Sequence, residues 1–333
     1  MTVFQASTKL NICKAFHVIT NKTKMKVDGK NKGIPLSGTD CIIKPQVALS
    51  AYTSYRVGGP AEWLVAPRSS ESLQACVAYA KEHELSITVL GAGSNLLISD
   101  DGIPGLVIAT RHMRHTNFDT ETGMVTFAAG ESIPALAWAA AERGWEGFEW
   151  GVGIPGTIGG AVVMNAGAHN SCIADMLVSI EVLTPDGTLQ TLTSEQLNYS
   201  YRTSMLQGSN LIVTQATLQL QPGADPAEVT ARTKQHKEHR LATQPYHLPS
   251  CGSVFRNPTP HSAGRLIEET GLKGFQIGQA QVAQRHANFI VNCGGATAND
   301  IFNLIRHVQY QVQERWSIGL HPEVKMIGEF QAA

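Results

Sequence analysis

The chain has 333 residues, enough for about two domains, and its 43% apolar and 16% charged residues are typical of a globular protein. The 26 basic and 27 acidic side chains nearly cancel, which argues against a nucleic-acid-binding protein or one that attaches to anionic membranes. No stretch approaches the ~18 apolar residues of a membrane-spanning helix, and the six cysteines form no CxxC or CxxH pair. We therefore expect a cytoplasmic protein with reduced thiols and no bound metal.

The first 45 residues are predicted to be a flexible, lysine-rich extension. Residues 1 to 33 contain seven lysines and a single acidic residue, Asp28, and their apolar residues follow neither a helical nor a strand period. From about residue 46 onward, periodic apolar segments predict folded structure.

Residues 46 to 222 alternate between predicted strands and helices. The spacing of the apolar residues predicts helices at 71–84 and 133–143. Short β-branched runs predict strands at 87–90, 96–98, 106–108, 125–128, 180–183, 189–192 and 211–220. The turn Pro185-Asp186-Gly187 would close a hairpin between two of these strands.

A second region is predicted from residue 223 to residue 333. Its first helix, 226–240, begins at Asp225-Pro226-Ala227-Glu228, which combines a capping carboxylate, a proline in the first turn and a glutamate three residues after the cap. Further helices are predicted at 263–269 and 299–316, and strands at 288–292 and 323–330.

Two glycine-rich segments stand out. The loop Gly91 to Asn95 follows an apolar strand, but Leu96 occupies the sixth position of a dinucleotide fingerprint, so the loop alone is more typical of a turn. Residues 144 to 167 hold eight glycines in 24 positions, and no charged side chain lies between Trp150 and Ala168. A buried glycine-rich backbone favours close approach to a large planar or phosphorylated ligand, with tight strand packing as the alternative.

Three short polar clusters lie farther along the chain, namely Tyr201-Arg202-Thr203-Ser204, Ser250 to Pro258 and His321-Pro322-Glu323. Each alone is typical of a turn or a solvated strand end. Ser253 lacks the GxSxG elbow of a serine hydrolase, and His236 and His239 lie on a lysine-rich helix without an HExxH motif, so the exposed side of a helix explains them better than a metal site.

Together and in this order, the glycine segments and polar clusters resemble the UDP-N-acetylmuramate dehydrogenases, also called UDP-N-acetylenolpyruvoylglucosamine reductases. The resemblance covers residues 46 to about 330. It rests on YRVGGPA at 55–61, LGAGSNLL at 90–97, GIPGTIGGAVVMNAGA at 153–168, YRTS at 201–204, GSVFRNP at 252–258, AGRLIEETGLKG at 263–274, HANFIVN at 286–292 and PEV at 322–324.

The resemblance implies an α+β fold: an FAD-binding region of the vanillyl-alcohol-oxidase-like kind at 46–222, divided into subdomains 46–110 and 111–222, and an α+β substrate domain at 223–333. It implies non-covalent FAD held by Gly91, Ala92, Gly93, Ser94, Asn95, Leu96, Gly153, Ile154, Pro155, Gly156, Ile158, Gly159, Gly160, Ala161, Asn165, Ala166 and Gly167. It also implies catalytic roles for Arg202, Ser253 and Glu323, and substrate contacts for Tyr201, Arg256 and Asn257. The short segment after Tyr201 is similar to the family's shorter form, which lacks an extra tyrosine loop.

The implied reaction uses NADPH to reduce the enolpyruvyl group of UDP-N-acetylglucosamine enolpyruvate in peptidoglycan precursor synthesis, and we expect a monomeric enzyme. Hydride would reach C3 from FAD N5, Arg202 and a protonated Glu323 would support the charge on C2 and the carboxylate, and Ser253 would protonate C2. Two alternatives remain: a sugar or aldonolactone oxidase of the same fold, and a nucleotide-sugar binding protein without flavin.

Overall fold

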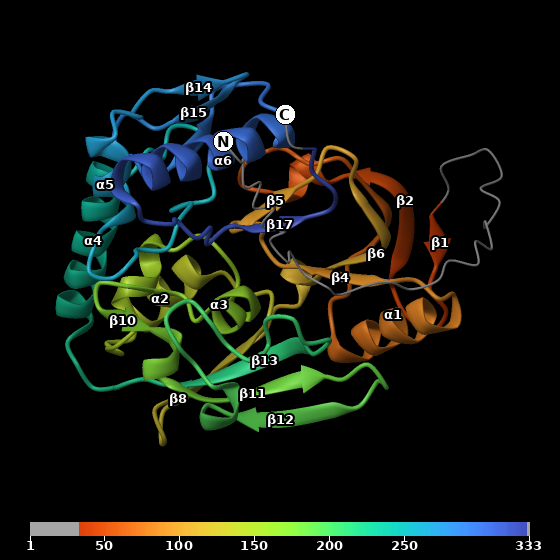
Figure 1. Ribbon diagram of the computed structural model, residues 1–333. Coiled ribbons are helices and arrows are strands. Elements are labelled where there is room, and N and C mark those ends of the chain that lie inside the picture. Colours follow the sequence, from red (N-terminus) through yellow and green to blue (C-terminus); the bar gives the residue numbers. More distant parts are fainter. Residues whose placement is uncertain (1–32, 332–333) are drawn as a thin grey trace. The chain divides into compact units, whose positions relative to one another are not determined.

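The computed structural model describes residues 33–331 of the protein (Figure 1). Most of the predicted N-terminal extension therefore lies outside the described residues. Residues 33 to 45, however, contradict the prediction of a flexible segment. They form β1 (Ile34–Pro35) and the start of β2 (Ile42–Ala48), because Ile43 is fully buried and the backbone of β2 pairs with the next strand.

The first sheet has the order β1-β2-β3-β6-β4, with β3 at Pro60–Val65, β4 at Ile87–Leu90 and β6 at Ile103–Ala109. β3, β6 and β4 run parallel, so their carboxyl ends share one edge of the sheet. Helix α1 (Ser70–Glu82) buries Leu73 and Cys76 in the same hydrophobic cluster as Ile43 and Trp63. Its start is capped by Ser69 Oγ, which accepts a hydrogen bond from Ser72 N at 3.2 Å.

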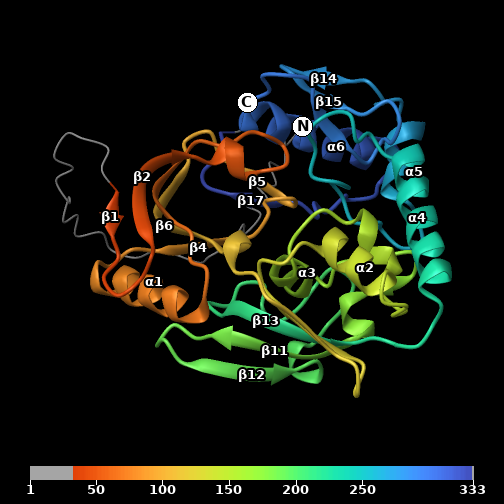
Figure 2. The same cartoon turned by 180° about the vertical axis from the view of Figure 1, so that it is seen from behind.

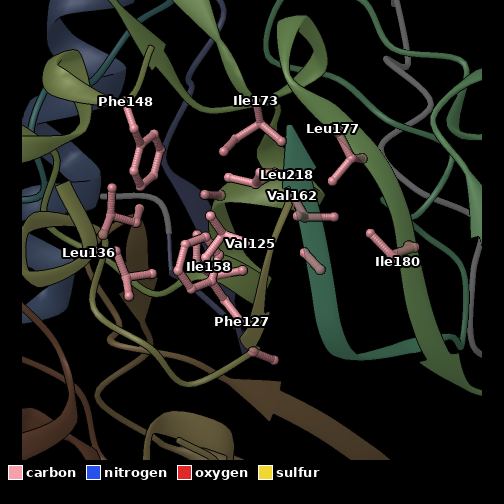
Figure 3. Packing of buried hydrophobic residues seen from close by; sticks show 14 of the residues in the cluster. Val125, Phe127, Leu136, Phe148, Ile158, Val162, Ile173, Leu177, Ile180 and Leu218 are labelled. Atoms are coloured by element: carbon pink, nitrogen blue, oxygen red, sulfur yellow. The ribbon is translucent and has the colours of Figure 1, made fainter. Parts of the chain in front are cut away.

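The second sheet is antiparallel and has the order β12-β11-β13-β8-β7 (Figure 2). Its strands are β7 (Thr116–Asp119), β8 (Met124–Ala128), β11 (Leu177–Leu183), β12 (Leu189–Thr193) and β13 (Ile212–Gln219). Helices α2 (Ile133–Ala141) and α3 (Ile158–Met164) cover it, and Figure 3 shows Phe127, Ile158 and Val162 among the side chains packed between these layers. The pattern of residues 158–164 does not predict α3, because Gly159 and Gly160 lower its helix propensity.

The C-terminal region contains three helices and a small sheet. The helices are α4 (Pro226–Thr243), α5 (Ala263–Glu269) and α6 (Ala298–Trp316), and the strands are β14 (Gln276–Ile277), β15 (Ala280–Val282) and β16 (Ile290–Asn292). Helix α6 packs against the sheet and α5 packs against α6, whereas α4 packs against α2 of the preceding region. Asp225 caps α4 as predicted, and a capping box of Thr297 and Asp300 starts α6. Tyr55, Val57 and Leu97 from the first region also belong to this hydrophobic core, which ties the two regions together.

The last strand differs from its prediction. The apolar pattern predicts a strand over 323–330 within the C-terminal region, but β17 spans only Lys325–Ile327 and pairs in parallel with β5 (Leu96–Ile98) of the first region. β5 begins directly after the first glycine loop, and Glu323 lies two residues before β17. The pairing of β17 with β5 therefore brings Glu323 close to that loop.

Short elements connect these parts. They are η1 (Leu49–Tyr52), η2 (Thr110–His112), η3 (Glu149–Gly153), η4 (Ile173–Asp175), η5 (Glu195–Leu197), β9 (Gly167–Ala168) and β10 (Ser171–Cys172).

Candidate active site

The first glycine loop, Gly91 to Asn95, leaves the carboxyl end of β4, beside the segment η2 that leaves β6. A Cβ atom on Gly91 would lie 2.6 Å from Thr157 Oγ1, and one on Gly93, whose φ is +65°, would lie 2.0 Å from the carbonyl oxygen of Tyr52. The loop can follow this path only with glycine at these two positions.

The second glycine segment lies against the first. Ser94 Oγ donates a hydrogen bond to the Pro155 carbonyl at 2.8 Å, and Gly156 adopts a φ of +149°. Thr157 then precedes α3. Two glycine-rich stretches that are 61 residues apart at this hydrogen bond therefore lie side by side and form one backbone surface.

The residues around this surface fit the diphosphate of a dinucleotide such as FAD. Within residues 33–331, Thr157 Oγ1 and Arg111 Nε are buried without a hydrogen-bond partner. The Arg111 guanidinium lies 4.0 Å from the ring centroid of Tyr52, whose carbonyl faces Gly93. Glycine amides, an unused hydroxyl and an arginine are the groups that recognise phosphate oxygens. None of the residues predicted from the sequence to bind FAD is Arg111, Tyr52 or Thr157. Arg111 and Tyr52 lie outside both glycine-rich segments, whereas Thr157 lies inside the second, between the predicted residues Gly156 and Ile158.

Arg202 and Glu323, which are 121 residues apart in the sequence, form an ion pair. Arg202 Nε donates to Glu323 Oε1 at 3.1 Å, and the two side chains are only 20% and 18% exposed. Arg202 Nη1 and Nη2 donate to the carbonyls of Asn165 and Gly167 at 3.3 and 2.7 Å. The guanidinium is thus fixed by the glutamate and by the segment that follows α3.

The backbone at Arg202 is held in the left-handed region, with a φ of +56°. Its carbonyl accepts hydrogen bonds from Arg256 Nη2 at 3.2 Å and from Gln207 Nε2 at 3.0 Å. Gln207 also receives a hydrogen bond from Lys325 Nζ at 2.7 Å. Gln207 and Lys325 are therefore part of the site, and no motif in the sequence marked them.

The backbone of Glu323 is hydrogen-bonded both to the first glycine loop and to the segment that contains Ser253. Its carbonyl accepts from Asn95 Nδ2 at 3.1 Å, and its N–H donates to the Val254 carbonyl at 2.7 Å. Ser253 precedes Val254, so the structure brings the segments of all three predicted catalytic residues together. The Ser253 hydroxyl makes no hydrogen bond with any residue that the structure describes.

Comparisons with known proteins match this arrangement. A model of an FAD binding domain matches residues 61–193, and a model of the C-terminal domain of UDP-N-acetylenolpyruvoylglucosamine reductase matches residues 244–327. The enzyme of that name from Nostoc punctiforme is 69% identical over 333 residues, 100% of both chains, and that of Synechocystis is 57% identical over 89% of this chain and 94% of its own. The chain belongs to this reductase family. The crystal structure of the Thermus caldophilus enzyme matches with a TM-score of 0.72 and 37% identity, covering 84% of this chain and 97% of that one.

The predicted α+β fold class is confirmed: an FAD-binding region precedes a C-terminal α+β domain. The domain limits at 45, 110 and 222 stay predictions, apart from the correction at residues 33–45. Among residues 33–331, no helix is long and apolar enough to cross a membrane, and no group of three or more metal-ligating side chains is found.

The residues predicted to bind FAD have side chains in different environments, and not all of these side chains can contact a cofactor. Ile158 and Ala161 face the hydrophobic core, so only their backbone can meet a cofactor (Figure 3 labels Ile158). Asn165 is buried, and its side chain holds Ala174 N and Ser200 O. A Cβ on Gly153 would lie 2.0 Å from Arg240 Cδ, so an arginine covers this glycine. The remaining residues of the set lie in the glycine loop, at the start of β5, between residue 154 and the first turn of α3, or just after α3, where Ala166 precedes β9 and Gly167 begins it.

The three predicted substrate residues are Tyr201, Arg256 and Asn257. Tyr201 and Arg256 contact Arg202, and Asn257 follows Arg256 in the chain. The Tyr201 ring is exposed, and the Arg202 guanidinium lies 5.0 Å from its centroid. Arg256 Nη1 donates to Thr203 Oγ1 at 3.3 Å. Asn257 Oδ1 accepts from Ala263 N at 3.0 Å and so fixes the start of α5, which leaves its amide N–H groups for other partners.

Gly93→Ala should lower both FAD content and melting temperature. The left-handed backbone costs an alanine roughly 1–2 kcal/mol, and the new Cβ would in addition collide with the Tyr52 carbonyl. Gly187→Ala is the matched control, because Gly187 has a φ of +89° but nothing within 4 Å of the added Cβ. We would measure visible absorbance per protein and thermal unfolding of both variants. Equal FAD loss in both would contradict a role for the close approach at Gly93.

Proposed function

We propose that this protein reduces the enolpyruvyl group of UDP-N-acetylglucosamine enolpyruvate to give UDP-N-acetylmuramate, with FAD as cofactor and NADPH as the reductant. The observation that carries the proposal is the partly buried Arg202–Glu323 pair, joined through Asn95 to the glycine loop. A cationic group and a carboxyl group beside a diphosphate-binding surface match the needs of this substrate class. The product is a peptidoglycan precursor.

The substrate has a C=C bond conjugated to a carboxylate. Bound FAD, reloaded by NADPH, supplies the hydride that this bond accepts at C3. Negative charge then spreads over C2 and the carboxylate, and a proton must reach C2. The protein has to bind the carboxylate, stabilise the developing charge and deliver the proton.

Arg202 is the group that binds the carboxylate. A guanidinium has five N–H donors, and the three bonds to Glu323, Asn165 and Gly167 use one on Nε and one on each Nη. One donor on each Nη therefore remains for a substrate oxygen. Because the protein already fixes the plane of the guanidinium, these donors need no reorganisation as charge develops.

In this proposal Glu323 takes up a proton before it acts, so that its ion pair with Arg202 becomes a hydrogen bond to a neutral carboxyl. Burial raises the pKa of this carboxyl above its usual range, while the positive charges of Arg202 and Arg256 oppose the shift only in part. A neutral carboxyl can still accept the Arg202 hydrogen bond on Oε1 and carry its proton on Oε2. That proton would be donated to the developing enolate, as a positioned hydrogen-bond donor rather than a second negative charge.

Ser253 delivers the proton to C2. Its hydroxyl has no partner among the described residues, and Gly252, with a φ of +75°, makes the turn that presents it. A strongly basic carbanion makes a neutral hydroxyl a competent acid when the hydroxyl is held in place. Tyr201, Arg256 and Asn257 would contact the rest of the nucleotide sugar.

The visible spectrum tests this function directly. Purified protein should show the absorbance of oxidised flavin, lose it on anaerobic addition of NADPH, and regain it when UDP-N-acetylglucosamine enolpyruvate is added. Reoxidation by oxygen but not by the enolpyruvyl substrate would identify an oxidase instead. A colourless protein that binds nucleotide sugars would identify a binding protein.

FAD is expected to be held without a covalent bond. Residues 151 to 167 contain no cysteine or histidine that could link to the flavin. Acid precipitation should therefore release all of the yellow colour into the supernatant. Colour that stays in the protein pellet would contradict this expectation.

A further inference from the structure

Two buried thiols, those of Cys41 and Cys76, take no part in the proposed reaction. Cys41 directly precedes β2, and Cys76 lies in the middle of α1. Both are free thiols, and they are only 4% and 0% exposed. They belong to the hydrophobic cluster between α1 and the first sheet, and α1 lies beside β1 in both views (Figures 1 and 2). The pair is therefore a cluster of nucleophilic groups outside the candidate active site.

The two thiols are close enough to interact. Burial raises the pKa of Cys76, and Cys41 raises it further through charge repulsion and a side-chain hydrogen bond. The segments that carry the two cysteines are also joined by an ion pair, because Arg68 Nε lies 3.8 Å from Asp40 Oδ2 just before α1 begins. Two groups that can be oxidised together are thus held side by side from separate segments of the chain.

A hollow of about 550 Å³ opens between the same two segments. Residues 37–40 line one side of it, and the start of α1 lines the other with Ser69, Glu71, Ser72 and Ala75. Residues 40 and 75 are the direct neighbours of the two cysteines in the chain. The volume lies within the ~300–1,000 Å³ of small-molecule sites. A small reagent in the hollow therefore contacts residues adjacent to both cysteines.

The two cysteines differ in how readily they can react. Cys41 is the more exposed, and its Sγ lies 3.9 Å from Oδ1 of Asp40, a residue that lines the hollow. Cys76 is fully buried, and its raised pKa keeps it as the protonated thiol, which is the less reactive form. Cys41 is therefore the thiol that a reagent in the hollow reaches first.

We propose that Cys41 and Cys76 form a reversible disulfide by exchange with a small disulfide that enters the hollow. In the first step the Cys41 sulfur attacks one sulfur of the small disulfide, whose S–S bond breaks and releases one thiol. In the second step the Cys76 sulfur attacks the Cys41 sulfur of this mixed disulfide, and the second small thiol leaves. The two cysteines lose two protons and two electrons, and the two released thiols carry them away.

The new bond would fasten the start of β2 to α1. β2 pairs with β3, and β3 pairs with β6, so the cross-link would join the helix to the sheet across their shared hydrophobic cluster. A cross-link between residues 41 and 76 restricts the unfolded chain. We expect the oxidised protein to unfold at a temperature at least about 3 °C above that of the reduced protein.

The test uses the full-length holoenzyme at about pH 8, where thiolates begin to form, in buffers that contain glutathione and glutathione disulfide in varied ratio. The samples are quenched with acid, alkylated in denaturant and digested with trypsin. Trypsin yields the peptides 33–56 and 69–81, and each contains a single cysteine of the pair. Mass spectrometry should find the two peptides joined after oxidation and separate after treatment with dithiothreitol.

Three variants test the assigned roles. Cys76→Ala should trap glutathione on Cys41, because the thiol that completes the exchange is missing. Cys41→Ala should leave Cys76 as a free thiol, and its melting temperature should be the same in oxidising and reducing buffer. Cys293→Ser is the matched control, because it removes an exposed thiol outside the pair and should form the disulfide as the wild type does.

The proposal would be overturned if Cys41 and Cys76 were both recovered as alkylated thiols at the highest proportion of glutathione disulfide, while Cys293 carried glutathione. A disulfide from either cysteine to another of the six would also overturn it. A cross-linked protein that melts no higher than the reduced one would overturn the fastening of α1. None of these measurements uses the enolpyruvyl substrate, so they stand apart from any test of the proposed function.

Discussion

Ser253→Ala should leave reduction by NADPH near the wild-type rate but slow reoxidation by the enolpyruvyl substrate at least 10²-fold, the scale of a lost general acid. The reason is that only the second step needs a proton at C2. The Ser253 segment is already held in place, because Val254 accepts a hydrogen bond from Glu323 N at 2.7 Å. Stopped-flow absorbance measures the two half-reactions separately.

Two further variants make this prediction specific. Ser253→Cys should recover part of the loss, since a thiol can also donate a proton. Ser250→Ala removes a neighbouring half-buried hydroxyl from the same loop and should reoxidise normally. Wild-type reoxidation in Ser253→Ala would remove Ser253 from the mechanism and leave water as the proton source. A loss confined to NADPH reduction would place Ser253 in the nicotinamide step.

Arg202→Lys should also slow reoxidation about 10²-fold or more, the effect of removing a preorganised donor from developing negative charge. A lysine ammonium cannot span Glu323, Asn165 and Gly167 at once while still facing the substrate. The variant should be reduced by NADPH at close to the wild-type rate. If it is reoxidised at the wild-type rate, the role assigned to Arg202 is wrong.

Glu323→Gln addresses the protonation state of the pair. Because burial raises the pKa of Glu323, its acid form persists to higher pH than that of an ordinary carboxyl, and wild-type reoxidation should fall as the pH rises through that pKa. The glutamine variant should be slower and should lack this fall. Wild-type reoxidation in the variant, or an unchanged pH profile, would contradict the role of the neutral carboxyl.

An exposed ion pair provides the control for both substitutions. Arg265 Nε donates to Glu269 Oε1 at 2.7 Å on the surface of α5. Arg265→Lys and Glu269→Gln make the same chemical changes away from the candidate active site. Neither should alter either half-reaction, since an exposed pair of this kind contributes little even to stability.

Local sequence was sufficient where local chemistry decides structure. The cap at Asp225, the apolar stripe of α6 and the glycine loop after β4 all appear where their patterns predict them. Local patterns did not predict the structure where residue types typical of one conformation lie in an element of another. The lysine-rich start of the chain concealed β2, in which Ile43 is buried against the first sheet, and two glycines concealed α3.

The sequence by itself determined the family, the fold class and the residue types of the candidate site, because the motifs around Arg202, Ser253 and Glu323 are short and contiguous. Only the tertiary structure decided how they meet. Arg202 and Glu323 are 121 residues apart, and Asn95 and Glu323 are 228 residues apart. Their contacts depend on β17 leaving its own region to pair with β5, a long-range choice that no local period encodes. The contact of Arg240 with Gly153 depends likewise on the packing of α4 against η3.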